Sequence, residues 1–515
     1  MKISLIILAA AVAMAGPLGA AEMKVGSQNG ERWWGAYVGN SPDQPFVQPF
    51  DLAPVQKSAS GFASTLLLSD MGRYIYCSAP MGVRFDGDVF TLRYDNDPPE
   101  LFNAGRTLRE AYRVACFRYF QPNNIAPAAE FLTSPLYDTN VEFGSFPTQE
   151  AILNFAERLV KEGFPKGIIL VGEGWSHVPG TYMFDPGAFP DPKAMVDRLH
   201  GMGFKLMLTV SPYAAAAGRS YIDNLRKDLL MLDAKGKPMV VSQEDGHFTA
   251  YDPGEKRTSD FIKENLLRLK SSCGVDGFRF DCNTLLPTLG DAQGARLMSR
   301  WLDVGKDVGL TEYYPGQNAR YTPYCNIVGA PRTVKGNPLL YDLTNITSAQ
   351  LCGYQFCRFV PGAVGDTTAL FSQNWLMMRV LQFQSMLPLQ SVPFAPWRIR
   401  DRGMYQSLRQ YMKQREQLAA YYAQLYREWL IAGEPIVRHM EYMFPRSGFS
   451  NCNDQFMLGS RYLCAPLLER KSTRMVRLPR GVWVDTRGRQ YRGPVVVIVS
   501  DADGRPPIFE LTTAK

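Results

Sequence analysis

The sequence predicts an α/β fold in which a (β/α)8 barrel, the TIM barrel, lies between an N-terminal antiparallel β-domain and a small C-terminal β-sandwich. Three observations support this prediction. The chain has 515 residues, of which 46% are hydrophobic and 20% charged, as in ordinary globular proteins. Between residues 138 and 434, apolar runs alternate with amphipathic helical segments. Residues 22–137 and 435–515 instead hold short runs separated by turn-forming residues, as in antiparallel sheets.

Residues 1–21 have the pattern of a secretory signal peptide. Lys2 gives a short basic start, residues 3–15 are apolar, and small residues follow up to Ala21. The apolar run falls short of the roughly 20 residues that a membrane-spanning helix needs, so a membrane anchor is the less favoured alternative. We therefore expect cleavage after Ala21 and an exported protein, either periplasmic or secreted.

The segment 22–137 is expected to form the N-terminal β-domain. A helical period appears in it only at 107–118. Its apolar runs are short and are separated by Gly, Pro, Asn and Asp, which favour turns. These runs lie at 32–38, 64–68, 73–77 and 89–94.

Capping residues mark helix starts within the predicted barrel. Thr148 precedes a segment with apolar residues at three- and four-residue spacing, and Asp191 with Pro192 precedes a second one. Gly163 and Gly203 follow these helices, as glycine often does at a helix end.

Apolar strands are predicted at 167–171, 205–210 and 275–281, with a further helix at 258–270. Repeated strand–helix units predict a parallel sheet wound by helices. A closed barrel is favoured over an open doubly wound sheet, because no glycine-rich phosphate-binding turn follows the first strand.

The segment 435–515 returns to a strand pattern and is expected to form the small β-sandwich. Its predicted strands lie at 455–458, 462–465, 473–478, 482–485, 495–499 and 508–511.

Charge and motif content exclude several classes of function. The net charge of +7 comes from 56 basic and 49 acidic residues spread along the chain, so no nucleic-acid partner is expected. The four histidines lack metal-ligand spacing, and no C-x-x-C motif occurs, so we expect neither a metal site nor a cofactor. Cys352 with Cys357, or Cys452 with Cys464, could pair, but most cysteines are expected to be small buried residues.

Carboxylates follow several of the predicted barrel strands, where the functional residues of such barrels lie. Glu173 follows 167–171, Asp281 ends 275–281, and Glu312 follows a short run at 308–311. Two carboxyl groups in one cleft are what a glycosidase needs, one as nucleophile and one as acid/base. We expect these three side chains to meet at the C-terminal rim.

Aromatic residues near the same strand ends are candidates for stacking on sugar rings. Trp175 and Tyr182 follow the strand at 167–171, Tyr213 follows 205–210, and Trp397 lies near the end of the barrel. Most aromatic side chains of a barrel are simply core, which is the alternative interpretation of these four.

Several segments resemble glycoside hydrolase family 31, the retaining α-glycosidases. The similarity runs in order over most of 138–512. Segment 139–170 (TNVEFGSFPTQEAILNFAERLVKEGFPKGIIL) is similar to the α-galactosidase-like branch, which includes the myogenesis-regulating glycosidase. The other segments are FDPGAFPDPKAMVDRLHGMGFKLMLTVSPY (184–213), GVDGFRFD (274–281), SVPFAPWRI (391–399), QFMLGSRYLCAPLLE (455–469) and VRLPRGVWVDTRGRQYRG (476–493).

The resemblance implies that Asp281 is the nucleophile, at the end of the fourth strand. GVDGFRFD also resembles the α-amylase family, which keeps an Arg at the place of Arg279, two residues before its nucleophile. That family expects an Asp and an Asn-His pair after strand three, which LTVSPYAAAAG does not supply, so family 31 is favoured. The residues expected to bind substrate are Glu173, Trp175, Tyr213, Arg279, Glu312 and Trp397.

The sequence departs from the family at places that matter for catalysis. Gly172-Glu173 stands where the family usually has Asp-Asp or Asp-x-Asp, Asn283 stands where a Gly-Glu is frequent, and the expected Arg of strand five is missing from LTEYYPG. The loss of the strand-two aspartate argues against plain glucose as the sugar in the cleaved subsite.

The general acid is the largest departure. In GYQFCRFVPGAVGD (353–366), the place of the family's acid falls on Val360 or Gly362, and neither can donate a proton. Asp366 is the nearest carboxylate and is the candidate acid/base, with Glu312 in reserve. We expect the true acid to be partly buried, because burial raises the pKa of a carboxyl group.

Two functions remain open from the sequence. The first is an exported retaining α-glycosidase that hydrolyses α-galactosides or α-glucosides by double displacement. The second is a protein of the same fold that binds α-linked oligosaccharides or glycosides but hydrolyses them poorly or not at all.

Overall fold

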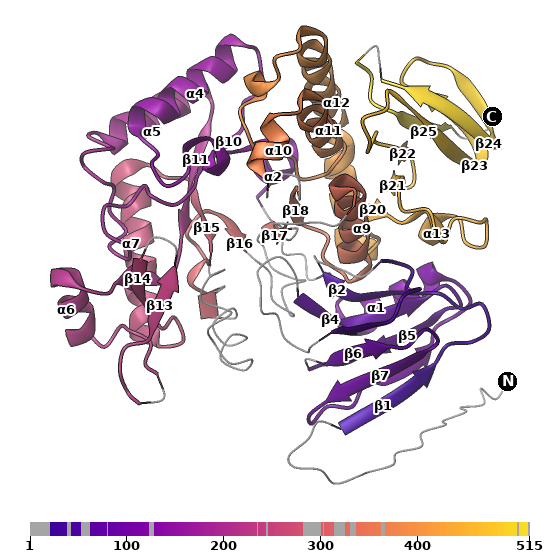
Figure 1. The fold of residues 1–515 in the computed structure, drawn as a ribbon, viewed down its shortest axis with the longest axis horizontal. Coiled ribbons are helices and arrows are strands. Elements are labelled where there is room, and N and C mark those ends of the chain that lie inside the picture. The colour runs from indigo at the N-terminus through magenta and orange to yellow at the C-terminus, as the bar shows by residue number, and fades with distance from the viewer. Residues whose placement is uncertain are drawn as a thin grey trace.

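Figure 1 shows the arrangement of the chain in the computed structural model. The structure describes residues 21–38, 43–52, 62–79, 81–122, 128–233, 235–243, 246–281, 300–301, 303–313, 325–329, 336–361, 366–501 and 504–512.

The N-terminal part contains two antiparallel four-stranded sheets, which confirms the predicted β-domain. Their orders are β1-β7-β6-β3 and β2-β4-β5-β8. Side chains from both sheets, including Trp33, Ile75 and Phe90, form one apolar core between them. The strands are β1 (Ala21–Gly26), β2 (Trp33–Val38), β3 (Phe50–Leu52), β4 (Phe62–Ser69), β5 (Arg73–Tyr76), β6 (Gly82–Phe85), β7 (Val89–Tyr94) and β8 (Glu100–Asn103).

Helix α1 (Leu108–Tyr119) packs on the second of these sheets. The Thr107 hydroxyl caps it by accepting from the N–H of Glu110 over 3.2 Å. Tyr112 of the helix shares a buried cluster with Trp34 and Tyr74 of the sheet. The helical period at 107–118 therefore corresponds to a helix, and this helix covers the sheet.

Eight parallel strands form the central sheet, in the order β18-β17-β16-β15-β11-β10-β9-β19. This is the strand order of a (β/α)8 barrel. Over the described residues no backbone ladder joins the end strands β18 and β19; instead, Arg358 Nη1 donates to the carbonyl of Gln390 over 2.6 Å. The predicted barrel is thus found in part. Its strands are β9 (Leu136–Asp138), β10 (Ile168–Val171), β11 (Lys205–Val210), β15 (Gly277–Phe280), β16 (Leu310–Tyr313), β17 (Cys325–Gly329), β18 (Cys357–Val360) and β19 (Ser391–Val392).

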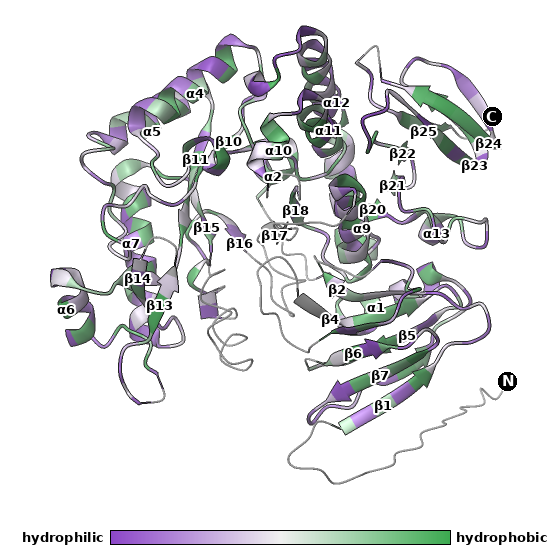
Figure 2. Cartoon of the chain, viewed as in Figure 1, coloured by the Kyte–Doolittle hydropathy of each residue, from purple (hydrophilic) through white to green (hydrophobic). Residues whose placement is uncertain are grey.

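Helices cover the outside of this sheet, and their starts follow the predicted caps. Thr148 accepts from the N–H of Ala151 over 3.1 Å, and Asp191 from that of Ala194 over 2.9 Å. Figure 2 shows apolar and polar residues on different faces of these amphipathic helices. The larger helices are α4 (Gln149–Lys161), α5 (Pro192–Met202), α7 (Lys256–Cys273), α9 (Pro338–Leu351), α11 (Asn374–Ser385) and α12 (Arg402–Ala432).

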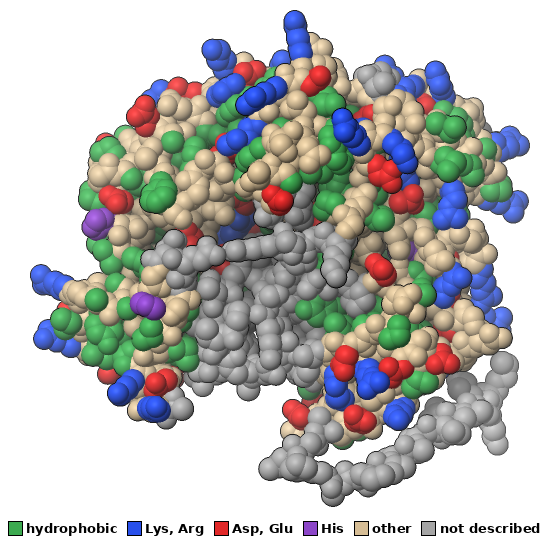
Figure 3. Space-filling model, in the orientation of Figure 1, with side chains coloured by type: hydrophobic (Ala, Val, Ile, Leu, Met, Phe, Trp, Pro, Cys, Tyr) green, Lys and Arg blue, Asp and Glu red, His purple; other side chains and the backbone are tan. Residues whose placement is uncertain are grey.

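A small excursion after β11 was not predicted from the sequence. It contains β12 (Tyr213–Ala215), α6 (Gly218–Arg226), β13 (Val240–Gln243) and β14 (Gly246–Ala250), with a three-stranded antiparallel sheet in the order β12-β14-β13. Figure 3 shows apolar side chains gathered on its surface. The exposed ones are Ile222, Leu225, Leu232 and Val240.

The C-terminal part forms a six-stranded sheet in the order β20-β21-β22-β25-β23-β24. The predicted C-terminal β-domain is confirmed as a sheet domain, and over the described residues its six strands lie in one hydrogen-bonded order. The strands are β20 (Val437–Arg438), β21 (Phe456–Leu458), β22 (Tyr462–Cys464), β23 (Thr473–Asp485), β24 (Gln490–Ser500) and β25 (Ile508–Thr512).

Two further expectations concern cysteines and membranes. Cys352, Cys357, Cys452 and Cys464 are buried thiols, and neither suggested disulfide forms. In the part of the chain that the structure describes, no helix is both long and apolar enough to cross a bilayer.

Candidate functional site

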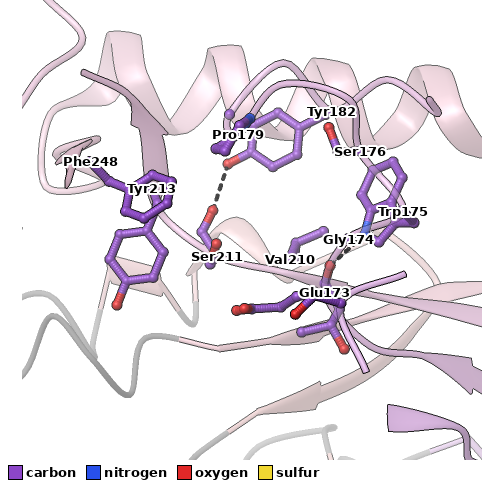
Figure 4. Close-up of a pocket in the computed structure, with 13 residues that line it drawn as sticks. Glu173, Gly174, Trp175, Ser176, Pro179, Tyr182, Val210, Ser211, Tyr213 and Phe248 are labelled. Carbon is purple, nitrogen blue, oxygen red and sulfur yellow. Dashed lines mark hydrogen bonds between the residues drawn. The ribbon is translucent and has the colours of Figure 1, made fainter. Parts of the chain in front are cut away.

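A pocket of about 180 Å³ lies at the carboxyl ends of β10 and β11, at the rim where barrels place their functional residues. Figure 4 shows the residues around it. The lining residues are Ser145, Glu173, Gly174, Trp175, Ser176, Pro179, Gly180, Tyr182, Thr209, Val210, Ser211, Tyr213 and Phe248.

The turn after β10 forms one wall of the pocket and depends on a glycine. Gly174 has φ +88°, and a Cβ atom added to it would lie 2.0 Å from the carbonyl oxygen of Ser145. Only glycine allows both the left-handed backbone and this close approach. The turn therefore packs directly on the loop after β9 and carries Glu173 and Trp175 to the rim.

Aromatic side chains give the pocket a rigid second wall. Trp175 is 3% exposed, and its Nε1 donates to the carbonyl of Thr209 over 2.7 Å. The Tyr182 hydroxyl donates to the carbonyl of Ser211 over 3.2 Å, and burial raises the pKa of this phenol well above its ordinary value. Tyr182 therefore stays protonated and keeps its hydrogen bond over the working pH range.

Asp281 lies beside this pocket, because its backbone is hydrogen-bonded to a residue that lines it. It follows β15 directly, is half-buried, and its N–H donates to the carbonyl of Val210, a lining residue, over 2.8 Å. Phe280 packs against Trp301 with ring centroids 5.1 Å apart, whereas Arg279 contacts other barrel strands. Because side chains alternate along a strand, Asp281 follows Arg279 on the inner side.

Three of the predicted substrate-binding residues meet at this pocket. Glu173 and Trp175 come from the turn after β10, and Tyr213 comes from β12. Figure 4 shows the Glu173 carboxylate on the side of the pocket that carries Tyr213, away from Trp175. A carboxylate and several ring faces around one small space are suited to a polyhydroxylated ligand.

Arg279 and Glu312 lie deeper than the rim. Glu312 is 0% exposed, because it belongs to β16 itself rather than to the turn after it. Its Oε1 accepts from Arg358 Nε over 2.8 Å and its Oε2 from Arg279 Nη2 over 3.2 Å. Both oxygens of Glu312 are thus occupied by arginines, which argues against its roles as a sugar ligand and reserve acid.

Trp397 does not line the pocket. It lies in the short helix η4 (Pro396–Arg398), and its ring packs against Phe155 of α4 with centroids 5.2 Å apart. The Arg158 guanidinium lies 4.4 Å from the ring centroid. The ring therefore faces the outer helical layer, where a sugar in the pocket cannot stack on it.

Asp366 lacks the burial expected of the acid. Its carboxylate is exposed and caps α10 (Thr367–Phe371) by accepting from the N–H of Ala369 over 2.9 Å. Val360, one of the two positions aligned with the family's acid, is the last residue of β18. Gly362 and Asn283 lie outside the described residues.

Phe248 and Thr209 are among the lining residues that were missed from the sequence. Phe248 belongs to β14 of the unpredicted excursion, and its ring lies 6.2 Å from that of Tyr213. Thr209 is 6% exposed, and its Oγ1 has no hydrogen-bond partner within the described residues. A threonine inside the otherwise apolar strand 205–210 was a signal that the sequence did contain.

Among the residues that the structure describes, no three of His, Cys, Asp and Glu come together as metal ligands.

Comparisons with known proteins place these features in one family. The model of the glycosyl hydrolases family 31 TIM-barrel domain matches residues 139–319, and that of the family 31 C-terminal domain matches residues 433–510. Together the two matches cover about half of the chain.

Curated relatives are similar over much of the chain. The myogenesis-regulating glycosidase of Mus musculus is 24% identical over 423 residues, which are 76% of this chain and 58% of the relative. The α-xylosidase XylQ of Lactiplantibacillus pentosus is 21% identical over 384 residues, which are 67% of this chain and 49% of the relative. The chain thus spans about half of the length of these relatives.

Solved structures share the fold. A family 31 dextranase of Flavobacterium johnsoniae, complexed with glucose, has a TM-score of 0.81 at 18% identity, covering 96% of this chain and 67% of the dextranase. A family 31 α-xylosidase from a soil metagenome, complexed with xylose, has a TM-score of 0.79 at 18% identity. The match covers 96% of this chain and 80% of the xylosidase. At this identity the likeness shows the fold alone.

Proposed function

The chain belongs to glycosyl hydrolase family 31, and from this premise we propose that it is a retaining α-glycosidase with Asp281 as its nucleophile. One observation carries the proposal: Asp281 follows the fourth barrel strand directly, beside the pocket that holds Glu173, Trp175 and Tyr213. A carboxylate at a strand end beside a polar, aromatic pocket is suited to the nucleophile, one of the two carboxyl groups that a retaining glycosidase uses.

The proposed reaction has two displacements. In the first, a carboxylate oxygen of Asp281 bonds to the anomeric carbon while the bond to the leaving-group oxygen breaks, and that oxygen takes up a proton. The product is a β-glycosyl ester on Asp281. In the second, water attacks the same carbon, loses a proton and displaces the Asp281 carboxylate, so the α configuration is restored.

The proposed substrates are neutral α-linked sugars of the galactoside or glucoside type. The Glu173 carboxylate can accept hydrogen bonds from sugar hydroxyls, and the rings of Trp175 and Tyr213 offer apolar faces. Glu173 stands where an aspartate is usual, so the sugar in this pocket is expected to differ from glucose in its hydroxyl pattern or substitution.

Sugar binding without efficient hydrolysis is the second candidate, and one observation favours it. The seventh strand ends at Val360, and Asp366, the nearest carboxylate after it, is an exposed helix cap. A natural glycoside needs a proton on its leaving oxygen, whereas a fluoride or an activated phenolate leaves without one. The two candidates therefore differ in which leaving groups the protein can release.

Export is part of the proposal. It rests on the basic, apolar and small-residue pattern of residues 1–21, which would direct the chain out of the cytoplasm.

The experiment compares substrates that carry the same sugar but different leaving groups. Purified protein is given α-galactosyl and α-glucosyl fluorides, the matching nitrophenyl glycosides and the matching disaccharides. Hydrolysis of all three kinds supports a complete glycosidase. Hydrolysis of the fluorides and nitrophenyl glycosides alone supports a nucleophile without an acid. Saturable binding with no turnover of any of them would leave the binding function in place of the enzyme.

A further inference from the structure

Four charged side chains form one network inside the barrel. Arg279 of β15 donates through Nη1 to Asp138 Oδ2 over 2.7 Å and through Nη2 to Glu312 Oε2 over 3.2 Å. Arg358 of β18 donates through Nε to Glu312 Oε1 over 2.8 Å. Two carboxylates and two guanidinium groups from strands one, four, five and seven are thus joined, and their charges cancel.

All four side chains of this network are buried, and removing their charges from water costs free energy. Asp138 is 9% exposed, Arg279 6%, and Glu312 and Arg358 are 0% exposed. Barrels usually fill this space with layers of branched apolar side chains. A buried ion pair gains little over a well-packed apolar replacement, because desolvation offsets the attraction. Stability alone therefore gives a poor account of four charges in this place.

Glu312 is the centre of the network. Each of its oxygens binds a different arginine, so it is the only group among these four that joins β18 to β15 through β16. Arg279 in turn reaches Asp138 at the end of β9, whose other oxygen accepts from the N–H of Asn140 over 3.1 Å. The network thus extends from the barrel interior to the loop that packs against the pocket.

The network ends two residues before the proposed nucleophile. Arg279 points inward, Phe280 packs outward on Trp301, and Asp281 is next on the inner side. The N–H of Asp281 is held by Val210. With Arg279 fixed from two sides, the end of β15 has little freedom to rotate or slide.

We propose that Glu312 is a positioning residue for Asp281: by holding Arg279 it sets the direction in which the Asp281 carboxylate meets the anomeric carbon. This inference rests on the proposed function. Misplacing a reacting group by about 1 Å can reduce a rate by roughly 100-fold, so a buried clamp two residues away is sufficient to matter.

The test uses two variants and measures the first displacement separately from folding. Glu312→Gln keeps the shape of the side chain but loses its charge. Glu312→Leu combined with Arg358→Met removes one acid and one base, so the remaining Arg279–Asp138 pair stays neutral and the fold is expected to be retained. The control is Glu441→Gln, a buried glutamate outside the barrel whose Oε1 accepts from the N–H of Arg446 over 2.7 Å.

The readout is the single-turnover rate with an α-glycosyl fluoride, at a temperature where thermal unfolding shows each variant to be folded. The expected result is a fall in this rate of about 100-fold in both Glu312 variants, with KM changed by less than about threefold, because binding groups at the pocket are untouched. Glu441→Gln should keep the wild-type rate.

The outcomes separate the inference from the function on which it rests. A double variant that is as stable as wild type and as fast would overturn the positioning role. A double variant that is stable and slow supports it. If Glu312 mattered only for folding, a variant as stable as wild type would also keep the wild-type rate. A wild-type protein that turns over no glycosyl fluoride removes the proposed function, and the positioning role with it.

Discussion

The backbone N–H of Asp281 donates to the carbonyl oxygen of Val210 over 2.8 Å, and this bond extends the pairing of β15 with β11 by one residue. Val210 lines the pocket that contains Glu173, so the bond fixes the end of the fourth strand beside the pocket. Asp281 is thus held by the sheet itself and not by a long loop. A nucleophile needs this kind of rigid support.

Replacing Glu173 by glutamine should lower kcat/KM for the best substrate by about 10- to 100-fold. The reason is that hydrogen bonds to a charged partner contribute about 1.5–3 kcal/mol, and the amide would weaken them. Steady-state kinetics on the fluorides and nitrophenyl glycosides measure the effect. The control is Glu157→Gln, because Glu157 pairs with Arg198 on the helical surface. Equal kcat/KM in both variants for every sugar would exclude Glu173 as a substrate ligand.

Replacing Gly174 by alanine should both destabilise the protein and reduce turnover. The new methyl group would meet the Ser145 carbonyl at 2.0 Å, so the turn that carries Glu173 and Trp175 has to move. Gly218→Ala is the matched control, because Gly218 has φ +81° with no atom within 4 Å of the added Cβ. We expect Gly218→Ala to cost about 1 kcal/mol and to keep wild-type kinetics. Similar losses in both variants, by thermal unfolding and kinetics, would contradict the packing argument.

Asp366 is predicted to act as a helix cap and not as the general acid. Asparagine caps as well as aspartate, so Asp366→Asn should keep both stability and activity, whereas Asp366→Ala should lose about 1 kcal/mol of unfolding free energy. Activity on disaccharides and on nitrophenyl glycosides is compared for both variants. A selective loss on the disaccharides in Asp366→Asn would restore Asp366 as the acid.

His439 should make the protein less stable in mild acid. Its ring is buried, with Nε2 3.1 Å from Asn453 Oδ1 and Nδ1 accepting from the N–H of Glu441, and burial lowers its pKa from 6.5 to about 4. Between these values the unfolded chain binds a proton that the folded protein does not, so stability is complete above pH 6.5 and falls as the pH drops toward 4. The lowered pKa of His439 accounts for roughly 3 kcal/mol of unfolding free energy between these two pH values.

Denaturant unfolding between pH 4 and 7 measures this contribution. His439→Gln should flatten the dependence of the unfolding free energy on pH relative to the wild-type protein. An unchanged slope in His439→Gln would mean that other groups cause the acid sensitivity.

Local signals in the sequence predicted much of the fold. The strand at 205–210 was predicted with the bounds of β11, and Thr148 and Asp191 cap their helices as expected, because period and capping depend on near neighbours. The excursion with β13 and β14 was missed, since its strands are short and partly polar. The same kind of local signal was available at Asp366, where an aspartate precedes Thr-Thr-Ala-Leu-Phe and caps α10.

Contacts between distant segments explain the remaining differences at the site. Glu312 was expected at the rim because the run 308–311 suggested that the strand had already ended, whereas β16 begins at Leu310 and includes it. Two arginines, 33 and 46 residues away in the sequence, then bind it in the interior. Trp397 packs on a helix more than 200 residues earlier, which no local pattern reveals.

The most direct test of the account is covalent trapping of the nucleophile. A 5-fluoroglycosyl fluoride is accepted without help from an acid, and its glycosyl–enzyme is hydrolysed slowly, so the label remains on the attacking residue. We predict one label per chain, found by peptide mapping on Asp281, and none in Asp281→Asn, whose thermal unfolding should match wild type. A label on any other residue of an active protein would contradict the central claim that Asp281, held by Val210, is the nucleophile.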